Sequence, residues 1–178
     1  RGFMKLYPLV FRPRLVAKMW GGRELERVAG KTLPDARSFG ESWDVFDFPP
    51  GSVGVDGRQP GDDPLGWTSA AVEEGPLAGT TLHELMLDAS TELLGDSRAV
   101  QTTHGPQFPL LVKFLDARQD LSVQVHPPES YAGVHPDAFV KNECWYILDR
   151  KPGARILAGA SPGTTRTILE QSVRDGTC

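Results

Sequence analysis

The sequence predicts a mainly β protein with a small helical segment, and three observations support this fold class. Short apolar segments follow one another after residue 108, separated by Pro, Gly and Asp: FPLLVKFLDA, LSVQVHP, ECWYIL and ARILAGA. This spacing of strands and turns is typical of a β-sandwich or barrel. The 19 Gly and 15 Pro predict short strands and long loops rather than a helical bundle. One strongly periodic helix precedes the strands.

The composition argues against several classes of function. The formal net charge is −4 and no block of five like charges occurs, so nothing indicates a nucleic-acid interface or a polybasic membrane patch. No apolar run approaches the roughly 18 residues of a membrane span, and the N-terminal segment does not resemble a signal peptide. Cys144 and Cys178 are too few for a disulfide scaffold, which predicts a reducing, cytoplasmic location.

The 178 residues suit one domain, 1–178, with a single clear helix. Residues 49–80 have little periodicity and are predicted to form a long surface loop with a hydrophobic clip or two. Residues 81–95 predict a helix that begins with a capping box of Thr81 and Glu84 and ends at Gly95. Its apolar residues recur at helical spacing, so one face should pack on a sheet.

The segment LSVQVHP places an amide and an imidazole on one face of a predicted strand. Gln124 and His126 are two residues apart, so on an extended chain their side chains point the same way. Leu121, Val123 and Val125 then face the other side, and we expect both faces to be covered. Two interpretations are open for the polar pair: a hydrogen-bonded interior pair, or ligands of a bound ion.

A carboxylate opens the next predicted strand, KNECWYIL at residues 141–148. In a hairpin-like arrangement Glu143 falls opposite Gln124 and His126, and the three side chains offer N and O donors that suit a divalent metal. A solvated charge at a strand edge is the alternative for Glu143. Lys141 is two residues before Glu143, so on an extended chain its side chain lies near the same site. It is either a surface lysine or a group that contacts substrate.

These motifs resemble a known family. FPLLVKFLDARQDLSVQVHP followed by KNECWYILDRKPGARILAG is similar to the type I mannose-6-phosphate isomerases, also called phosphomannose isomerases, which are zinc enzymes of the cupin class. WGG at residues 20–22, GESWD at residues 40–44 and the helix TLHELMLDASTELLG resemble further family stretches in the right order. The resemblance spans nearly the whole chain, although the family usually has Glu where this chain has Asp44.

The resemblance implies a cupin-like jelly roll that is incomplete in this chain. Its metal-site strands are expected at about residues 108–160, and Gln124, His126 and Glu143 are the implied ligands of one zinc ion per chain. A fourth ligand, His, and a catalytic Arg belong to later strands of the family. Because no His follows Glu143, the chain is expected to be the N-terminal portion of the enzyme, with those later strands absent.

The implied activity is the interconversion of mannose 6-phosphate and fructose 6-phosphate, with the metal polarising the C1 and C2 oxygens of a cis-enediol intermediate. Lys141 is the implied catalytic residue, in substrate contact or proton transfer. Trp43 and Lys113 are candidate substrate contacts. For Trp43 the alternative is a core position, and for Lys113 a surface lysine whose stem covers apolar neighbours.

Other functions remain open at this stage. A metal- or sugar-binding cupin without turnover, or a degenerate homologue used as an interaction module, would carry the same motifs. An iron cupin oxygenase fits less well, because this chain lacks the two-His facial triad. The expected partner is a sugar phosphate, with neither nucleic acid nor membrane, and the sequence does not define the oligomeric state.

Overall fold

The computed structural model describes residues 6–48, 69–97, 99–102, 105–135 and 140–177. The chain divides into two compact units, Arg1–Leu121 (unit 1) and Ser122–Cys178 (unit 2), and each is described by itself. Among the helices of these described residues, none has the length and apolar content needed to cross a bilayer.

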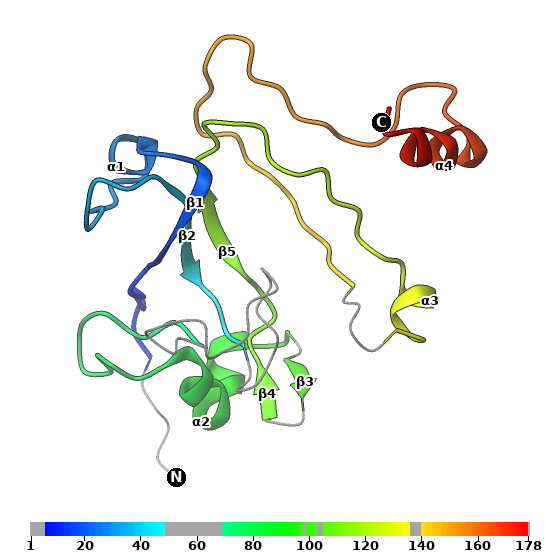
Figure 1. Cartoon of the computed structure of the whole chain (residues 1–178). Helices are drawn as coiled ribbons and strands as arrows, with labels where there is room; N and C mark the ends of the chain where they lie inside the picture. Colours follow the sequence, from blue (N-terminus) through cyan, green and yellow to red (C-terminus); the bar gives the residue numbers. More distant parts are fainter. Residues whose placement is uncertain (1–5, 49–68, 98, 103–104, 136–139, 178) are drawn as a thin grey trace. The chain divides into compact units, whose positions relative to one another are not determined.

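Unit 1 is built on a three-stranded antiparallel sheet whose central strand is β2 (Figure 1). The strands are β1 (Arg14–Gly22), β2 (Phe39–Val45) and β5 (Val112–Leu115). A hairpin of β3 (Val100–Thr102) and β4 (Gly105–Gln107) forms a second, smaller sheet. In register, Trp43 of β2 lies between Arg14 of β1 and Lys113 of β5.

The WGG motif at the end of β1 allows two backbones to approach closely. A Cβ atom on Gly21 would overlap the backbone of Phe39 and Gly40, and one on Gly40 would lie 2.6 Å from the Trp20 ring. Only residues without a side chain fit at this crossing. The β1–β2 register is irregular along the same stretch, where Phe39 pairs with both Ala17 and Gly22. The glycines of this motif therefore allow close packing of β1 against β2, and this packing accounts for them without a role in binding or catalysis.

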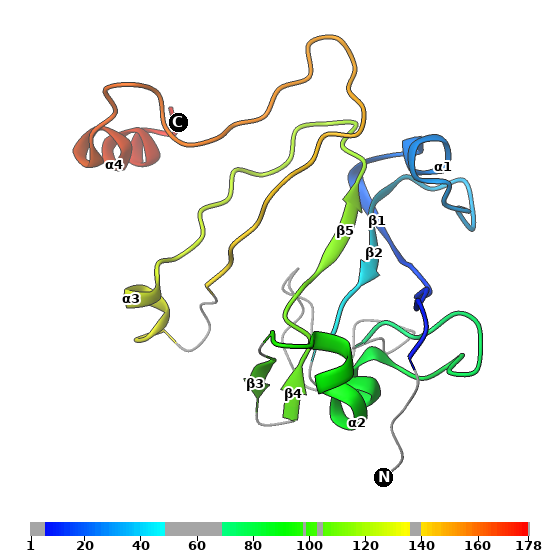
Figure 2. The ribbon, with the colours of Figure 1, turned by 180° about the vertical axis from the view of Figure 1, so that it is seen from behind.

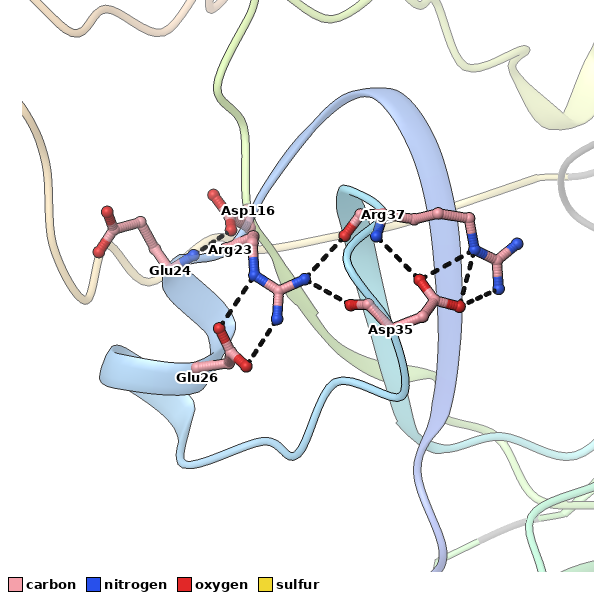
Figure 3. Close-up of polar contacts among 6 residues, drawn as sticks. All are labelled: Arg23, Glu24, Glu26, Asp35, Arg37 and Asp116. Carbon is pink, nitrogen blue, oxygen red and sulfur yellow. Dashed lines mark hydrogen bonds and ion pairs between the residues drawn. The ribbon is translucent and has the colours of Figure 1, made fainter.

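An arginine after this motif ties helix α1 (Glu24–Ala29) to the segment that enters β2 (Figure 3). The Nη1 atom of Arg23 donates to the carbonyl oxygens of Asp35 (2.6 Å) and Arg37 (3.0 Å). Its Nε and Nη2 atoms donate to the carboxylate of Glu26 at 3.1 and 2.8 Å. A hydrogen bond from Arg37 lowers the pKa of the Asp35 carboxyl, so this exposed pair stays ionised at neutral pH.

A buried carboxylate directly after β5, that of Asp116, also holds α1 against the sheet. Asp116 accepts the backbone N–H of Glu24 at 2.6 Å and so caps the start of α1 across 92 residues of sequence. Its own backbone N–H donates to the carbonyl oxygen of Gly40 at 2.9 Å. The carboxylate fills the space where a Cβ on Gly22 would stand. Sequence patterns give no signal for this long-range cap.

Two clusters of buried apolar side chains form the core of unit 1. One joins β1 and β2 to the stretch just after residue 68, and the other lies between α1 and the sheet. Residues 69–72, within the predicted loop at 49–80, act as the expected hydrophobic clip: Ala70 and Val72 are fully buried. Residues 49–68 lie outside the described part of the chain. The cluster members are Val16, Trp43, Phe46 and Ala70 in the first, and Leu25, Leu33 and Phe39 in the second.

Helix α2 (Leu82–Leu94) lies where the sequence predicts a helix, and its capping box is confirmed. Thr81 Oγ1 accepts the N–H of Glu84 at 3.2 Å, while Glu84 Oε2 accepts the N–H of Thr81 at 2.8 Å. The N–H of Gly95 donates to the carbonyl of Thr91 at the other end. The helix is kinked at Ala89, whose backbone is not helical. Its buried face is Leu82, Leu85, Met86 and Ala89.

Unit 2 differs from the expectation of further strands. Within its described residues the backbone contains α3 (Glu129–Ala132) and α4 (Arg166–Asp175) but no paired strand. The segments predicted as strands are extended without a ladder, and Figure 2 shows those on either side of α3 running side by side. Alternating side chains favour an extended backbone, but a sheet also needs a hydrogen-bonding neighbour at about 4.8 Å in register. The described part of the unit supplies none.

The missing neighbours also leave side chains exposed that were expected to be covered. Val123 is 75% and Val125 is 88% exposed. Helix α4 was not expected from the sequence, although Thr165 caps it, accepting the N–H of Ile168, and Gly176 ends it in a left-handed conformation. An ion pair between Arg166 and Glu170, four residues apart, supports its exposed surface.

We predict that the charge of Glu84 contributes to stability only above acidic pH. Hydrogen bonds from Thr81 lower the pKa of Glu84 below its usual value. A lowered folded-state pKa stabilises the protein above the unfolded pKa, and this contribution is lost as pH falls through the folded pKa. The variant Glu84→Gln keeps the capping hydrogen bond and should lower the free energy of unfolding by about 0.5 kcal/mol at pH 7.

Urea unfolding of both proteins from pH 7 downwards measures this difference. The two curves should converge as the pH falls through the lowered pKa of Glu84, where its carboxyl becomes protonated. A difference that stays constant throughout the acid range in which the protein is folded would contradict a role for the charge. Thr81→Ala is the companion variant, and it should cost about 1 kcal/mol at pH 7 by removing the cap itself.

Candidate metal centre

The two predicted motif segments of unit 2 bring a histidine and a glutamate together. His126 Nε2 lies 3.6 Å from Glu143 Oε1. The two residues are separated by α3 and by seventeen positions of sequence, so the approach comes from the antiparallel run of the two extended segments (Figure 2). Both side chains are about one-third exposed, at 29% and 34%. The juxtaposition expected for these residues is therefore present without the sheet that was expected to create it.

Lys141 lies on the other side of the same carboxylate. Its Nζ is 2.9 Å from Glu143 Oε2, so the two oxygens of Glu143 have different neighbours. The hydrogen bond from Lys141 lowers the pKa of Glu143 below its usual value, and electrostatic attraction to Lys141 and His126 acts in the same direction. Glu143 is therefore an ionised carboxylate at neutral pH. The spacing of two residues on an extended chain explains why both side chains reach one side.

The third expected ligand, Gln124, lies on the same segment as His126 but is not joined to the pair by a direct contact. Its amide Nε2 donates to Ser122 Oγ at 3.3 Å, and its side chain is exposed. The expectation of an enclosed cavity for Gln124 and His126 is wrong for the described residues, since neither side chain is buried. Gln124 as a ligand stays a prediction.

The His126–Glu143 pair has the geometry of two ligands that share an ion. Two donors held about 2.1 Å from a tetrahedral ion lie about 3.4 Å apart, close to the observed separation. Imidazole nitrogen and carboxylate oxygen are both accepted by zinc, and an amide oxygen is compatible with them. Among the described residues, His, Cys, Asp and Glu side chains form no group of three or more around one point.

Trp43 and Lys113, the predicted substrate contacts, belong to unit 1 and are linked through Glu41. Trp43 is 2% exposed, and its indole Nε1 donates to Glu41 Oε2 at 2.6 Å. Lys113 Nζ lies 3.5 Å from Glu41 Oε1. Arg14 covers the Trp43 ring from the neighbouring strand, at 4.9 Å from its centre. Trp43 is thus a core residue, as the alternative interpretation held, while Lys113 is half-buried with its charge partly paired.

Another polar pair was not anticipated. The side chain of His83 is only 15% exposed, and its Nδ1 lies 3.2 Å from the buried Asp47 Oδ1. The other oxygen of Asp47 accepts the N–H of Phe108 at 2.9 Å. These contacts join α2 to the end of β2. No local pattern in the sequence links residues 47, 83 and 108, so only the tertiary structure reveals them.

Three further residues bear on the metal centre. Cys144, which strand alternation would turn away from the side of Glu143, is exposed. His135 stacks on Tyr131 with ring centres 3.9 Å apart. His104 lies outside the described residues.

Comparisons with known proteins place these features in a family. Residues 66–153 match the family model "Phosphomannose isomerase type I, catalytic domain". The chain is 35% identical to the probable mannose-6-phosphate isomerase GmuF and 36% identical to the mannose-6-phosphate isomerase ManA, both of Bacillus subtilis. These alignments cover 96% and 97% of the chain but 46% and 47% of the relatives. The chain thus spans about half the length of the curated relatives it matches.

A solved structure gives the same assignment. The crystal structure of the mannose 6-phosphate isomerase from Bacillus subtilis matches 95% of this chain with a TM-score of 0.71 and 32% identity, and 46% of that protein is covered. The fold and the site define a mainly β protein of the cupin type with a histidine–carboxylate pair, which confirms the predicted fold class. The chain belongs to the type I phosphomannose isomerase family.

We predict that Trp43 contributes more to stability than Lys113. Trp43→Ala removes a buried ring from the first core cluster and should lower the free energy of unfolding by about 3–5 kcal/mol. Lys113→Met removes the cation beside the buried Glu41 and should cost about 1–3 kcal/mol, because Glu41 keeps its hydrogen bond from Trp43. Chemical unfolding followed by circular dichroism measures both. Equal losses in the two variants would contradict this division.

Proposed function

We propose that the protein is a zinc-dependent aldose–ketose isomerase that interconverts mannose 6-phosphate and fructose 6-phosphate. Membership of the family and the names of the relatives support the reaction, and the approach of His126 Nε2 to Glu143 Oε1 supports the metal centre. That 3.6 Å approach carries the proposal, because it joins the QVHP and NECWY motifs in space. Cytoplasmic action stays a prediction from the sequence, and the substrate is the only partner we propose.

The residues of this chain have separate tasks in the proposed reaction. His126, Glu143 and Gln124 hold one zinc ion, which when bound would polarise the C1 and C2 oxygens of the substrate during passage through a cis-enediol. Glu143 is the only anionic ligand of the three, so the site keeps much of the ion's positive charge. Lys141, on the outer oxygen of Glu143, is placed to contact substrate or to move a proton between C1 and C2. Lys113 stays a proposed substrate contact, and Trp43 supports it through Glu41.

We predict that His126→Ala abolishes both zinc binding and isomerase activity. The imidazole supplies one of the two donors that already face each other, and alanine supplies none. Metal analysis and a coupled isomerase assay on the 178-residue chain, and on any longer protein that contains it, measure the two properties. Turnover that survives both His126→Ala and chelation would contradict the metal mechanism. Zinc binding by the unaltered protein without turnover would favour the alternative of a non-catalytic metal- or sugar-binding cupin.

Gln124→Glu tests why a neutral ligand occupies this position. The added negative charge should leave zinc bound but make the ion a weaker polariser of the substrate oxygens. We therefore expect kcat to fall roughly 10- to 100-fold with the zinc content unchanged. Gln124→Asn, which keeps the neutral amide, is the matched control for charge. A Gln124→Glu protein with unaltered kcat would remove the proposed use of the neutral amide.

A further inference from the structure

The two carboxylate oxygens of Glu143 have different neighbours: one is near the proposed site of a metal cation, and the other contacts the ammonium group of Lys141. Oε1 faces the proposed metal position beside His126, at 3.6 Å from the imidazole nitrogen. Oε2 holds the ammonium group of Lys141 at 2.9 Å. The carboxylate carries a single negative charge, so a cation bound at one oxygen weakens the electrostatic attraction of the other oxygen for a second cation. The arrangement makes Lys141 and a metal ion neighbours that compete for Glu143.

We propose that Lys141 changes partner during the binding cycle: it pairs with Glu143 before the metal is bound and is released to the anionic substrate afterwards. This inference rests on the proposed function of the site, since it assumes a divalent ion at His126 and Glu143. It adds that metal and sugar phosphate bind with positive cooperativity and that Lys141 transmits the coupling.

Simple electrostatics gives the sign of each effect. In the structure Lys141 stabilises the ionised form of Glu143, so any second cation at this carboxylate must share its charge and lies near the ammonium group. Like charges a few ångströms apart repel, which weakens binding of the metal when no substrate is present. A phosphate-bearing ligand offers the ammonium group another partner and relieves this repulsion. By linkage, the metal must then strengthen binding of that ligand by the same factor.

The exposure of the pair limits the size of the effect. The side chains of Lys141 and Glu143 are 31% and 34% exposed, so solvent and salt screen their interaction in part. Couplings between sites in proteins are commonly about 5- to 150-fold, and a pair that is about one-third exposed belongs at the lower end. The effect should also shrink as ionic strength rises, which a purely steric role of Lys141 would not predict.

Zinc affinity, measured by competition with a chromophoric chelator, tests the proposal on the 178-residue chain. Lys141→Met should bind zinc roughly five- to tenfold more tightly than the unaltered chain in the absence of ligand. Adding mannose 6-phosphate should tighten zinc binding several-fold in the unaltered chain and not in Lys141→Met, whereas uncharged mannose should do so in neither. Lys141→Arg, which keeps the charge, should behave like the unaltered chain. Lys151→Met removes an exposed lysine ten residues further along the same segment and is the matched control.

The outcomes separate this inference from the proposed function. Zinc binding by the unaltered chain, tighter binding by Lys141→Met and loss of the mannose 6-phosphate effect together support the change of partner. If the unaltered chain binds zinc but Lys141→Met binds it equally or more weakly, the change of partner is contradicted while the metal centre stands. An equal gain in Lys151→Met contradicts it as well, since the effect would then be one of overall charge. No zinc binding by the unaltered chain would contradict the proposed metal centre itself.

Discussion

The candidate site depends on the ionised carboxylate of Glu143, because both of its oxygens are engaged. The ammonium group of Lys141 and the imidazole of His126 approach it from different sides, and the hydrogen bond from Lys141, with electrostatic attraction to both groups, keeps the pKa of the carboxyl low. Without Glu143, the two extended segments of unit 2 would have no charged contact in common at this point. A metal centre here would use the same carboxylate that already organises its surroundings. Glu143 thus holds the neighbouring side chains in place and is also a proposed metal ligand.

In unit 1 the main constraint is steric: close backbone packing and backbone hydrogen bonds determine the positions of the strands. The WGG turn brings β1 against the backbone of β2, and Asp116 caps α1 from the end of β5. Together with Arg23, these contacts set where β2 begins and therefore where Glu41 and Trp43 stand on it. The family motifs near the start of the chain are thus explained by packing and hydrogen bonding. No direct role in chemistry is needed to account for them.

The sequence predicts local features well where a short pattern determines them. The capping box of Thr81 and Glu84, the helix that follows it and the joint direction of Lys141 and Glu143 all depend on neighbours two to four residues away. The mainly β fold class and the approach of His126 to Glu143 followed from motifs read together with the family resemblance. Such features can be predicted from local backbone geometry or from sequence similarity to a family over most of the chain.

Most of the features that sequence patterns missed depend on distant partners. The strands expected around His126 have the right alternation but no ladder, because pairing is decided by a neighbour and not by the segment itself. For the same reason Val123 and Val125 are exposed rather than covered. The cap supplied by Asp116 and the contact between His83 and Asp47 connect residues tens of positions apart, for which no spacing rule exists. Helix α4 is the exception, since Thr165 and Gly176 are recognisable local signals.

X-ray absorption at the zinc edge of the zinc-loaded chain tests the central claim most directly. The claim is that an imidazole and a carboxylate from the two motif segments bind one ion, although the exposed thiol of Cys144 stands next to the carboxylate in sequence. The account predicts a first shell of nitrogen and oxygen atoms at about 2.0–2.2 Å, with the outer scattering of imidazole. A sulfur atom at about 2.3 Å, or no imidazole scattering, would contradict it.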